Sequence, residues 1–309
     1  AGVLGVDDTQ PDPRSLSEAY LLSHHLHGLI EGLLITAAAC GLSRCLLVLP
    51  EALLDHQAAI FNAWEEIQAR GLHQGLELEL ELVRDALPSV WSDRPAGGLP
   101  EPSLALRLET WLHLTLVFSL GAARYRALGD EDQAGTCLLT LGGPLVRPGL
   151  VEAPLGGDLW QVVETLGGGL APEAKPLALC LDDGLGGFLI PPAAQIPLAP
   201  EELMDAGVSP TPSTLTIIEE GACLVDLTRR VLQRYWRLSE NEPRPARAML
   251  ARAARLVTEI TVGKGQPYHL DDLADLGQQM LAQHLAAAWP LISSLTYFHE
   301  QWRRHLEGE

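Results

Sequence analysis

The chain has 309 residues, of which 47% are hydrophobic and 20% are charged. This length and composition are typical of two or three ordered globular domains and atypical of disordered proteins. The 40 acidic residues outnumber the 21 lysines and arginines, so the summed field repels phosphate backbones and anionic lipid surfaces. We therefore expect no nucleic acid and no membrane surface among the partners.

Two stretches are strongly apolar, from Leu29 to Leu42 and from Ser103 to Leu120, but they are short or contain charged residues such as Glu31 and Glu109. Such segments cross a bilayer only at high cost, so we expect no direct membrane insertion. The five cysteines are odd in number, scattered and flanked by apolar residues, which favours buried thiols in a reducing compartment. The sequence thus predicts a cytoplasmic protein that is at most peripheral to a membrane complex.

Residues 1–134 are expected to form an α/β domain. Leucines at helical spacing predict one helix that begins with a capping box at Ser15 and Glu18 and ends at Gly41. A buried strand at 45–49 and a helix at 52–71 follow.

Leucine and glutamate then alternate over residues 76–83, which predicts a half-exposed strand. The Pro- and Gly-rich stretch at 85–102 is expected to be a loop, and helical spacing resumes over 103–127. The Glu side chains of the strand either form a charged docking edge or block unwanted edge pairing.

Residues 135–200 and 201–309 are expected to form two further domains. The former contains short apolar segments, a Pro148-Gly149 turn and a brief helix at 158–166, which predict a small β-grasp-like domain. The latter opens with a strand at 214–218 and continues as a small helical bundle. Its four expected helices span residues 223–238, 246–262, 270–288 and 291–305.

Several segments resemble, in the same order, the NADH- and flavin-binding subunit of respiratory complex I. Residues 28–41 and the strand at 46–49 resemble the helix and strand that follow the flavin loop of that family, and Leu108-Glu109-Thr110 resembles its Val-Glu-Thr helix start. Residues 145–156 resemble the Pro-Gly hairpin of its ubiquitin-like (SLBB-type) domain, and residues 286–298 resemble its last helix pair. The resemblance covers nearly the whole chain.

Related subunits serve in complex I, in NAD-linked hydrogenases and in NAD-dependent formate dehydrogenases. There the protein takes a hydride from NADH onto FMN and passes electrons to a 4Fe–4S cluster. The resemblance therefore implies the fold of a flavin-domain-like layer, a β-grasp domain and a helical bundle. It also implies other subunits of a redox complex as partners, among them a thioredoxin-like iron–sulfur subunit.

The flavin and NADH motifs of this family are degenerate here. No Gly-rich phosphate loop occurs, and Gly121 and the run Gly167 to Gly169 lie in or after helical patterns, where glycine is an ordinary helix stop. The family's Asn-Ala-Asp-Glu motif appears as Gly5-Val6-Asp7-Asp8, so Asp7 and Asp8 are either relics of cofactor binding or an ordinary acidic turn. Residues 84–88 replace the Gly-Glu-Glu segment that binds nicotinamide in the family.

The iron–sulfur motif has lost its ligands. The family supplies three thiolates from Ser-Cys-Gly-x-Cys-x-x-Cys-Arg and one from a later helix. The matching stretch, residues 239–247, has Glu240, Pro243 and Ala246 in place of those cysteines, and Leu281 falls near the fourth. Carboxylate, ring and alkyl groups cannot replace soft sulfur ligands at the four irons.

Two other groups of residues are candidate sites. His24 and His27 share a helix face at i, i+3 and, with His25, fit either a metal pair or a solvated helix face that needs no metal. Trp302, Arg303 and Arg304 in the last helix fit either a docking surface or ordinary surface.

The leading hypothesis is a non-catalytic structural or regulatory subunit of a multi-subunit redox complex, without catalytic residues, metal ligands or a resident cofactor. An alternative is an NADH:acceptor flavoprotein whose flavin loop lies upstream of Ala1 or on a partner chain. A third hypothesis is a stand-alone module in which residues 147–192 bind a small ligand or another protein. Bound flavin or an iron–sulfur signal from this chain alone would exclude the first.

Overall fold

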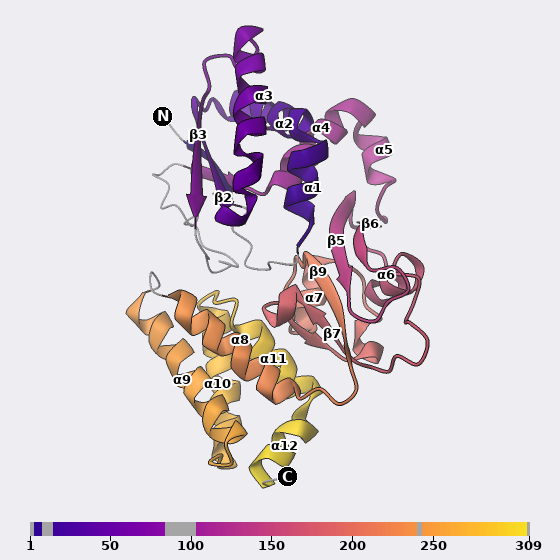
Figure 1. Ribbon diagram of the computed structural model, residues 1–309, viewed down its shortest axis with the longest axis vertical. Helices are drawn as coiled ribbons and strands as arrows, with labels where there is room; N and C mark the ends of the chain where they lie inside the picture. The colour runs from indigo at the N-terminus through magenta and orange to yellow at the C-terminus, as the bar shows by residue number, and fades with distance from the viewer. Residues whose placement is uncertain (1–2, 8–14, 84–102, 240–242, 308–309) are drawn as a thin grey trace. The chain divides into compact units, whose positions relative to one another are not determined.

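The computed structural model describes residues 3–7, 15–83, 103–239 and 243–307. The chain divides into two compact units, one extending to Leu138 and the other from Leu139 to Glu309. Figure 1 labels the helices and strands of both units. Each unit has its own sheet, and the mixed α/β class expected from the sequence is confirmed.

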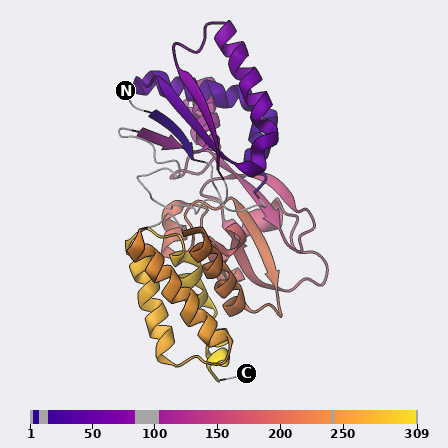
Figure 2. The same ribbon diagram turned by 60° about the vertical axis from the view of Figure 1, so that its left-hand side comes forward.

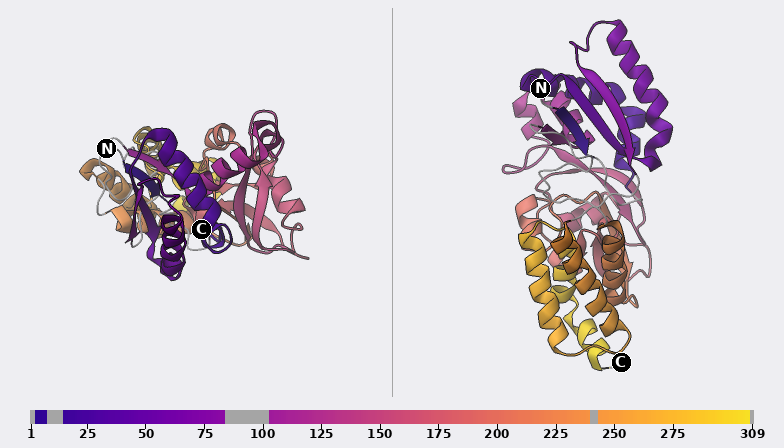
Figure 3. Two further views of the ribbon diagram at one scale, coloured as in Figure 1. Left: turned by 90° about the horizontal axis from the view of Figure 1, so that it is seen from above. Right: turned by 90° about the vertical axis from the view of Figure 1, so that its left-hand side faces the viewer.

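The first unit contains a four-stranded sheet in the order β3-β2-β1-β4. Its strands are β1 Val3–Asp7, β2 Arg44–Pro50, β3 Glu77–Val83 and β4 Ser103–Leu106. All three strand pairs are parallel, and β1, β2 and β3 lie side by side in Figure 3. Parallel neighbours require a crossover connection, usually a helix, and helices separate β1 from β2 and β2 from β3.

The helices of this unit are shorter than the sequence predicted. They are α1 Ser17–His24, α2 Leu26–Cys40, a 3-10 helix Glu51–His56, α3 Gln57–Ala69, α4 Leu108–Leu120 and α5 Ala122–Arg126. The expected helix from Ser15 to Gly41 is interrupted at His25, whose φ and ψ of −128° and 19° are not helical. Gly41 ends α2 in the left-handed conformation, as predicted.

Two further details of the prediction were wrong. Ser15 Oγ donates to the Glu18 carboxylate at 2.8 Å, so the pair bonds side chain to side chain, and no side-chain cap bond forms at the start of α1. Residues 103–106 are a strand rather than the start of a helix, because they pair with β1. The helix begins at Leu108 instead, where the resemblance placed it.

The core of the first unit lies between its helices and the sheet. Trp111 of α4 is 1% exposed and packs in one cluster with leucines of α1, α2 and β2. Helices α2 and α4 approach closely, as shown by the hydrogen bond that Thr115 Oγ1 donates to the carbonyl of Gly28 at 2.8 Å. An ideal Cβ built on Gly32 would lie 2.0 Å from the Trp111 carbonyl oxygen, so this contact depends on glycine.

The second unit begins with a five-stranded sheet in the order β6-β5-β9-β7-β8. Its elements are β5 Thr136–Gly142, β6 Gly149–Pro154, α6 Leu159–Thr165, β7 Pro176–Leu181, β8 Gly187–Leu189, α7 Pro200–Asp205 and β9 Thr214–Glu219. The order 2-1-5-3-4, with the first and last strands parallel and a helix between the second and third, is that of the β-grasp fold. The strand β9, which was expected to belong with the C-terminal helices, lies inside this sheet.

Five helices follow the sheet in the described part of this unit. They are α8 Leu224–Leu238, α9 Arg244–Thr261, α10 Tyr268–Ala282, α11 Ala288–Tyr297 and α12 His299–Glu307. Helices α8 to α11 run side by side, orange to yellow in Figure 2. The fourth expected helix, over 291–305, is divided at Phe298, whose φ and ψ of −123° and 28° leave the helical region.

Polar contacts fix the helices against this sheet. The Ser293 hydroxyl of α11 accepts the Phe188 N–H of β8 at 2.9 Å, and the Tyr235 hydroxyl of α8 donates to the Leu185 carbonyl at 3.1 Å. Burial raises the pKa of Tyr235 well above its usual range, so this hydroxyl remains a donor. In the turn after β7, Asp182 Oδ1 accepts the N–H groups of Ser213 and Thr214 at 2.8 and 3.1 Å.

The carboxylate of Asp226 is expected to make a small, pH-dependent contribution to stability. Burial acts to raise its pKa, but the hydrogen bonds and charges of Arg229 and Arg230 outweigh burial and lower the pKa below the usual 3.8. A lowered folded-state pKa means that this stabilisation is present above pH 3.8 and is lost as the pH falls through the folded-state value. We expect Asp226→Asn to lose at most about 1 kcal/mol at pH 7 and the difference to vanish in acid.

Urea unfolding of both proteins between pH 7 and pH 3 measures this difference. Asp275→Asn, which changes an exposed carboxylate of α10, is the matched control and should show no such trend. A difference for Asp226→Asn that stays constant or grows toward acid pH would contradict the assignment.

Candidate functional site

The counterpart of the iron–sulfur motif lies at the connection between α8 and α9. Ser239 is buried at the end of α8, and its hydroxyl donates to the Trp236 carbonyl at 2.7 Å. Glu240 lies outside the described residues. Pro243 directly precedes α9, where its φ of −54° suits a helix start. The flanking Ser239 and the ligand position Pro243 thus serve as ordinary helix ends.

The other two ligand positions are filled by hydrocarbon. Ala246 in the first turn of α9 is 3% exposed, and Leu281 is a half-buried residue in the last turn of α10. Leu250 and Met280, on the same two helices, are also fully buried. Methyl and isobutyl groups offer no electron pair to a metal, so the side chains described here do not fit a four-iron cluster.

The five cysteines are distributed over different elements and do not replace the lost ligands. Cys40 is exposed at the end of α2, Cys45 and Cys180 are buried in β2 and β7, and Cys137 and Cys223 are half-buried. Burial raises the pKa of the Cys45 thiol to about 12, so it stays protonated. Within the described residues, no group of three or more His, Cys, Asp or Glu side chains is placed to hold a metal ion.

The predicted flavin relic lies at the end of a parallel strand. Asp7 is the last residue of β1 and pairs in register with Val48 of β2. The carboxyl ends of parallel strands are where open α/β sheets bind ligands. Asp8 and the segment 84–88 lie outside the described residues, so the cofactor role of Asp7 and Asp8 stays a prediction.

The glycine clusters do not form a phosphate loop. The N–H groups of Gly167 and Gly169 donate to the carbonyls of Val162 and Val163, at 3.2 Å each. These amides therefore close the end of α6 and are not available to an anion. Gly121 separates α4 from α5 with a φ of 81°, which is an ordinary helix end.

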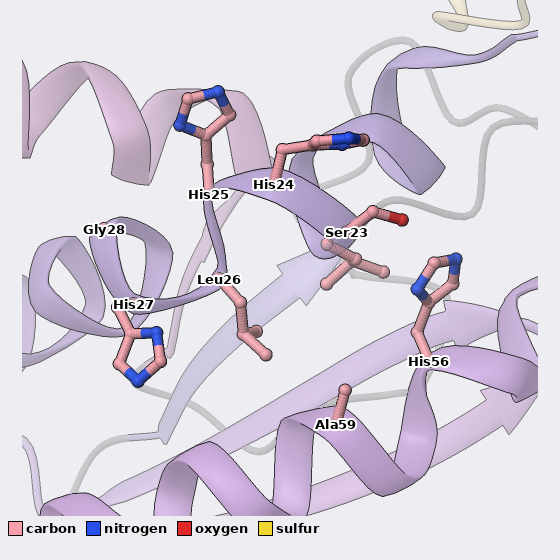
Figure 4. A pocket seen from close by; sticks show the side chains of 9 residues that line it. Ser23, His24, His25, Leu26, His27, Gly28, His56 and Ala59 are labelled. Atoms are coloured by element: carbon pink, nitrogen blue, oxygen red, sulfur yellow. The ribbon is translucent and has the colours of Figure 1, made fainter.

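The histidine group lines an open pocket of about 380 Å³ between α1, α2 and the start of α3. His24 ends α1 and His27 lies in α2 beyond the break at His25, so the continuous helix face expected for them does not exist. Figure 4 shows the side chains of His25 and His27 pointing in different directions, away from His56. His24 Nδ1 lies 3.1 Å from the Tyr20 carbonyl and His27 lies 3.8 Å from Glu66, contacts typical of a solvated surface.

The proposed docking residues of the last helix do not share one environment. Trp302 is 0% exposed, so it is a core residue that holds α12 in place, and the expectation that it lies on the surface was wrong. Arg303 and Arg304 are exposed, and Arg303 lies 3.5 Å from Glu300. The strand β3 is the edge of the described sheet, with exposed glutamates alternating with half-buried leucines as predicted.

The structure brings together one pair of chemically active side chains that the sequence did not predict. Cys223 Sγ lies 3.1 Å from His305 Nε2, although the two residues are 82 positions apart. No local spacing links them, so only the packing of α12 on α8 reveals the pair.

Among the described residues, no helix is both long and apolar enough to cross a membrane.

No protein-family model matches the chain. The chain is 25% identical to the F subunit of NADH-quinone oxidoreductase from Streptomyces coelicolor, over 99% of its own length and 75% of that protein. It is 24% identical to the F subunit from Mycobacterium tuberculosis, over 99% and 76%, and 25% identical to the F subunit from Escherichia coli, over 94% and 73%.

Solved structures of related architecture match the fold of the chain. An NAD+-reducing [NiFe]-hydrogenase in the H2-reduced state matches with a TM-score of 0.84 and 22% identity, covering 100% of this chain and 57% of that one. The air-oxidized state of such a hydrogenase matches with a TM-score of 0.82. The chain thus spans about three quarters of its curated relatives and just over half of the hydrogenase chain. Over nearly its whole length it is similar to the F subunit of NADH-quinone oxidoreductase, and it shares the fold of a chain of the NAD+-reducing hydrogenase.

Proposed function

We propose that the chain is a non-catalytic structural or regulatory subunit of a multi-subunit redox complex of the complex I, hydrogenase or formate dehydrogenase type. The observation that carries the proposal is the set of side chains at the cluster positions. Pro243, Ala246 and Leu281 provide a pyrrolidine ring, a methyl group and an isobutyl group. None of them can bind iron.

The loss of a cluster has a direct consequence for electron flow. In the resembled family a flavin receives two electrons from NADH and a cluster removes them. Without that acceptor, a flavin bound to this chain would have no four-iron cluster at these positions to reduce. Among the described residues at these positions, Pro243 directly precedes a helix and Ala246 is buried in the first turn of that helix, which supports the loss of the site.

The retained fold supports a role in assembly. The described residues form two sheets and five C-terminal helices, and we infer that this fold serves assembly, since fold alone does not imply activity. We therefore propose that its partners are other subunits of a redox complex, including a thioredoxin-like iron–sulfur subunit. FMN, NAD and the 4Fe–4S cluster are proposed to be absent from this chain.

The proposal is tested by purifying the tagged, full-length chain under native conditions from its source. We expect stoichiometric recovery of flavin- or iron-containing subunits, identified by mass spectrometry, with the cofactors on the partner chains. The chain produced alone should contain no flavin and should not reduce ferricyanide with NADH. Recovery of a lone chain with one bound flavin would refute the proposal and favour the flavoprotein alternative.

A further inference from the structure

The pair Cys223 and His305 connects two helices of the second unit. Cys223 directly precedes α8, and its Sγ lies 3.1 Å from His305 Nε2 of α12. The same sulfur accepts the backbone N–H of Asp226 at 3.3 Å. Both residues are partly exposed.

The position of His305 is fixed by other contacts of α12. Gln301, one turn earlier on the same helix face, accepts the Leu224 N–H at 2.7 Å and donates to the Ala222 carbonyl at 3.4 Å. Trp302 of the same helix is fully buried. These contacts hold α12 across the start of α8, so the imidazole is held next to the thiol by the packing of the helix.

The surroundings of Cys223 contain groups that can assist a sulfur nucleophile. An adjacent imidazole can take the thiol proton, and backbone N–H groups in the first turn of a helix stabilise an anion. The carboxylate of Asp226, which would oppose that charge, is engaged by Arg229 and Arg230 at 2.6 and 2.7 Å. The local charge around Cys223 is therefore not dominated by this acid, despite the net charge of −19 of the whole chain.

We propose that Cys223 is the reactive thiol of this chain, with His305 as its base, and that the pair is a site of oxidation by hydrogen peroxide. The thiol proton passes to His305 Nε2, and the thiolate attacks one peroxide oxygen. A sulfur–oxygen bond forms and the oxygen–oxygen bond breaks, so the sulfur is oxidised to a sulfenic acid. The departing hydroxide takes the proton from the imidazolium and leaves as water, which restores neutral His305.

The chain contains its own control. Cys40 is more exposed than Cys223 but is the last residue of α2, where the helix dipole disfavours an anion. If exposure alone decided reactivity, Cys40 would react first. The proposal predicts the opposite order.

The experiment exposes the full-length chain to dilute hydrogen peroxide, traps sulfenic acid with a dimedone probe, and quantifies each cysteine peptide by mass spectrometry over time. We expect Cys223 to be labelled about tenfold faster than Cys40, and His305→Gln to slow Cys223 by about tenfold without changing Cys40. Labelling of Cys40 at or above the rate of Cys223 in the wild-type protein overturns the proposal without any variant. So does an unchanged Cys223 rate in a folded His305→Gln protein, with folding checked by circular dichroism.

Discussion

Replacing Gly32 with alanine is expected to lower the free energy of unfolding of the first unit by about 3 kcal/mol. The added Cβ would lie 2.0 Å from the carbonyl oxygen and 2.6 Å from the carbonyl carbon of Trp111. Both are backbone atoms of α4, so no side-chain rotation relieves the overlap. The helices α2 and α4 must separate, which weakens the bond from Thr115 to Gly28 and the packing of the buried Trp111.

The matched control is Gly28→Ala, one turn earlier on the same helix. A Cβ at Gly28 would meet only the flexible Leu112 side chain, at 3.1 Å. The helix propensity of alanine also exceeds that of glycine by about 1 kcal/mol. We expect this variant to remain within about 1 kcal/mol of the wild type. Hydrogen exchange of α2 and α4 measures both changes. Equal losses at the two positions would show that the close helix contact does not control stability.

Replacing Asp182 with alanine is expected to destabilise the second unit by about 3 kcal/mol. Asp182 Oδ1 accepts three hydrogen bonds, from the Ser213 N–H, the Ser213 hydroxyl and the Thr214 N–H, at 2.8, 3.0 and 3.1 Å. Ser213 and Thr214 are each 1% exposed, so water cannot replace the lost acceptor there. Because Thr214 begins β9, the loss should loosen the central strand of the sheet.

Asp183→Ala provides the comparison, because it removes the same side chain from the same kind of backbone. Asp182 and Asp183 both have a positive φ, of 50° and 53°, so the unfavourable left-handed alanine is common to both variants and cancels. The Asp183 carboxylate lies 3.7 Å from Arg234 in a partly exposed pair, which contributes less than about 1 kcal/mol. Thermal unfolding of the two variants should therefore differ by about 2 kcal/mol. No difference would mean that the three hydrogen bonds to Asp182 contribute little.

The local patterns of this sequence predicted most elements, because each depends on its own residues. The alternation of Leu and Glu over 76–83 predicted β3, and Gly41 ends α2, as its conformational freedom suggested. The strand at 103–106 was missed because its pairing partner, β1, lies about a hundred residues earlier and short apolar runs fit a helix equally well. The breaks at His25 and Phe298 were missed because the helical spacing of apolar residues continues across them.

For the candidate site too, residue identity could be predicted from the sequence and long-range packing could not. The absence of sulfur at positions 243, 246 and 281 is a property of residue identity and needs no coordinates. The burial of Trp302 and the approach of His305 to Cys223 depend on how α12 packs against α8, which no local pattern encodes. For the histidine group the local pattern was misleading. The spacing of His24 and His27 suggested one helix face, but the helix is interrupted at His25.

The most direct measurement is anaerobic reconstitution of the purified full-length chain with ferrous iron and sulfide, followed by iron analysis and electron paramagnetic resonance of the reduced sample. A bacterial ferredoxin treated in the same way confirms that clusters assemble. We predict no four-iron signal and no stoichiometric iron from this chain, because three of its four ligand positions contain hydrocarbon and none contains sulfur. About four irons per chain, with the resonance of a reduced 4Fe–4S cluster, would contradict the account.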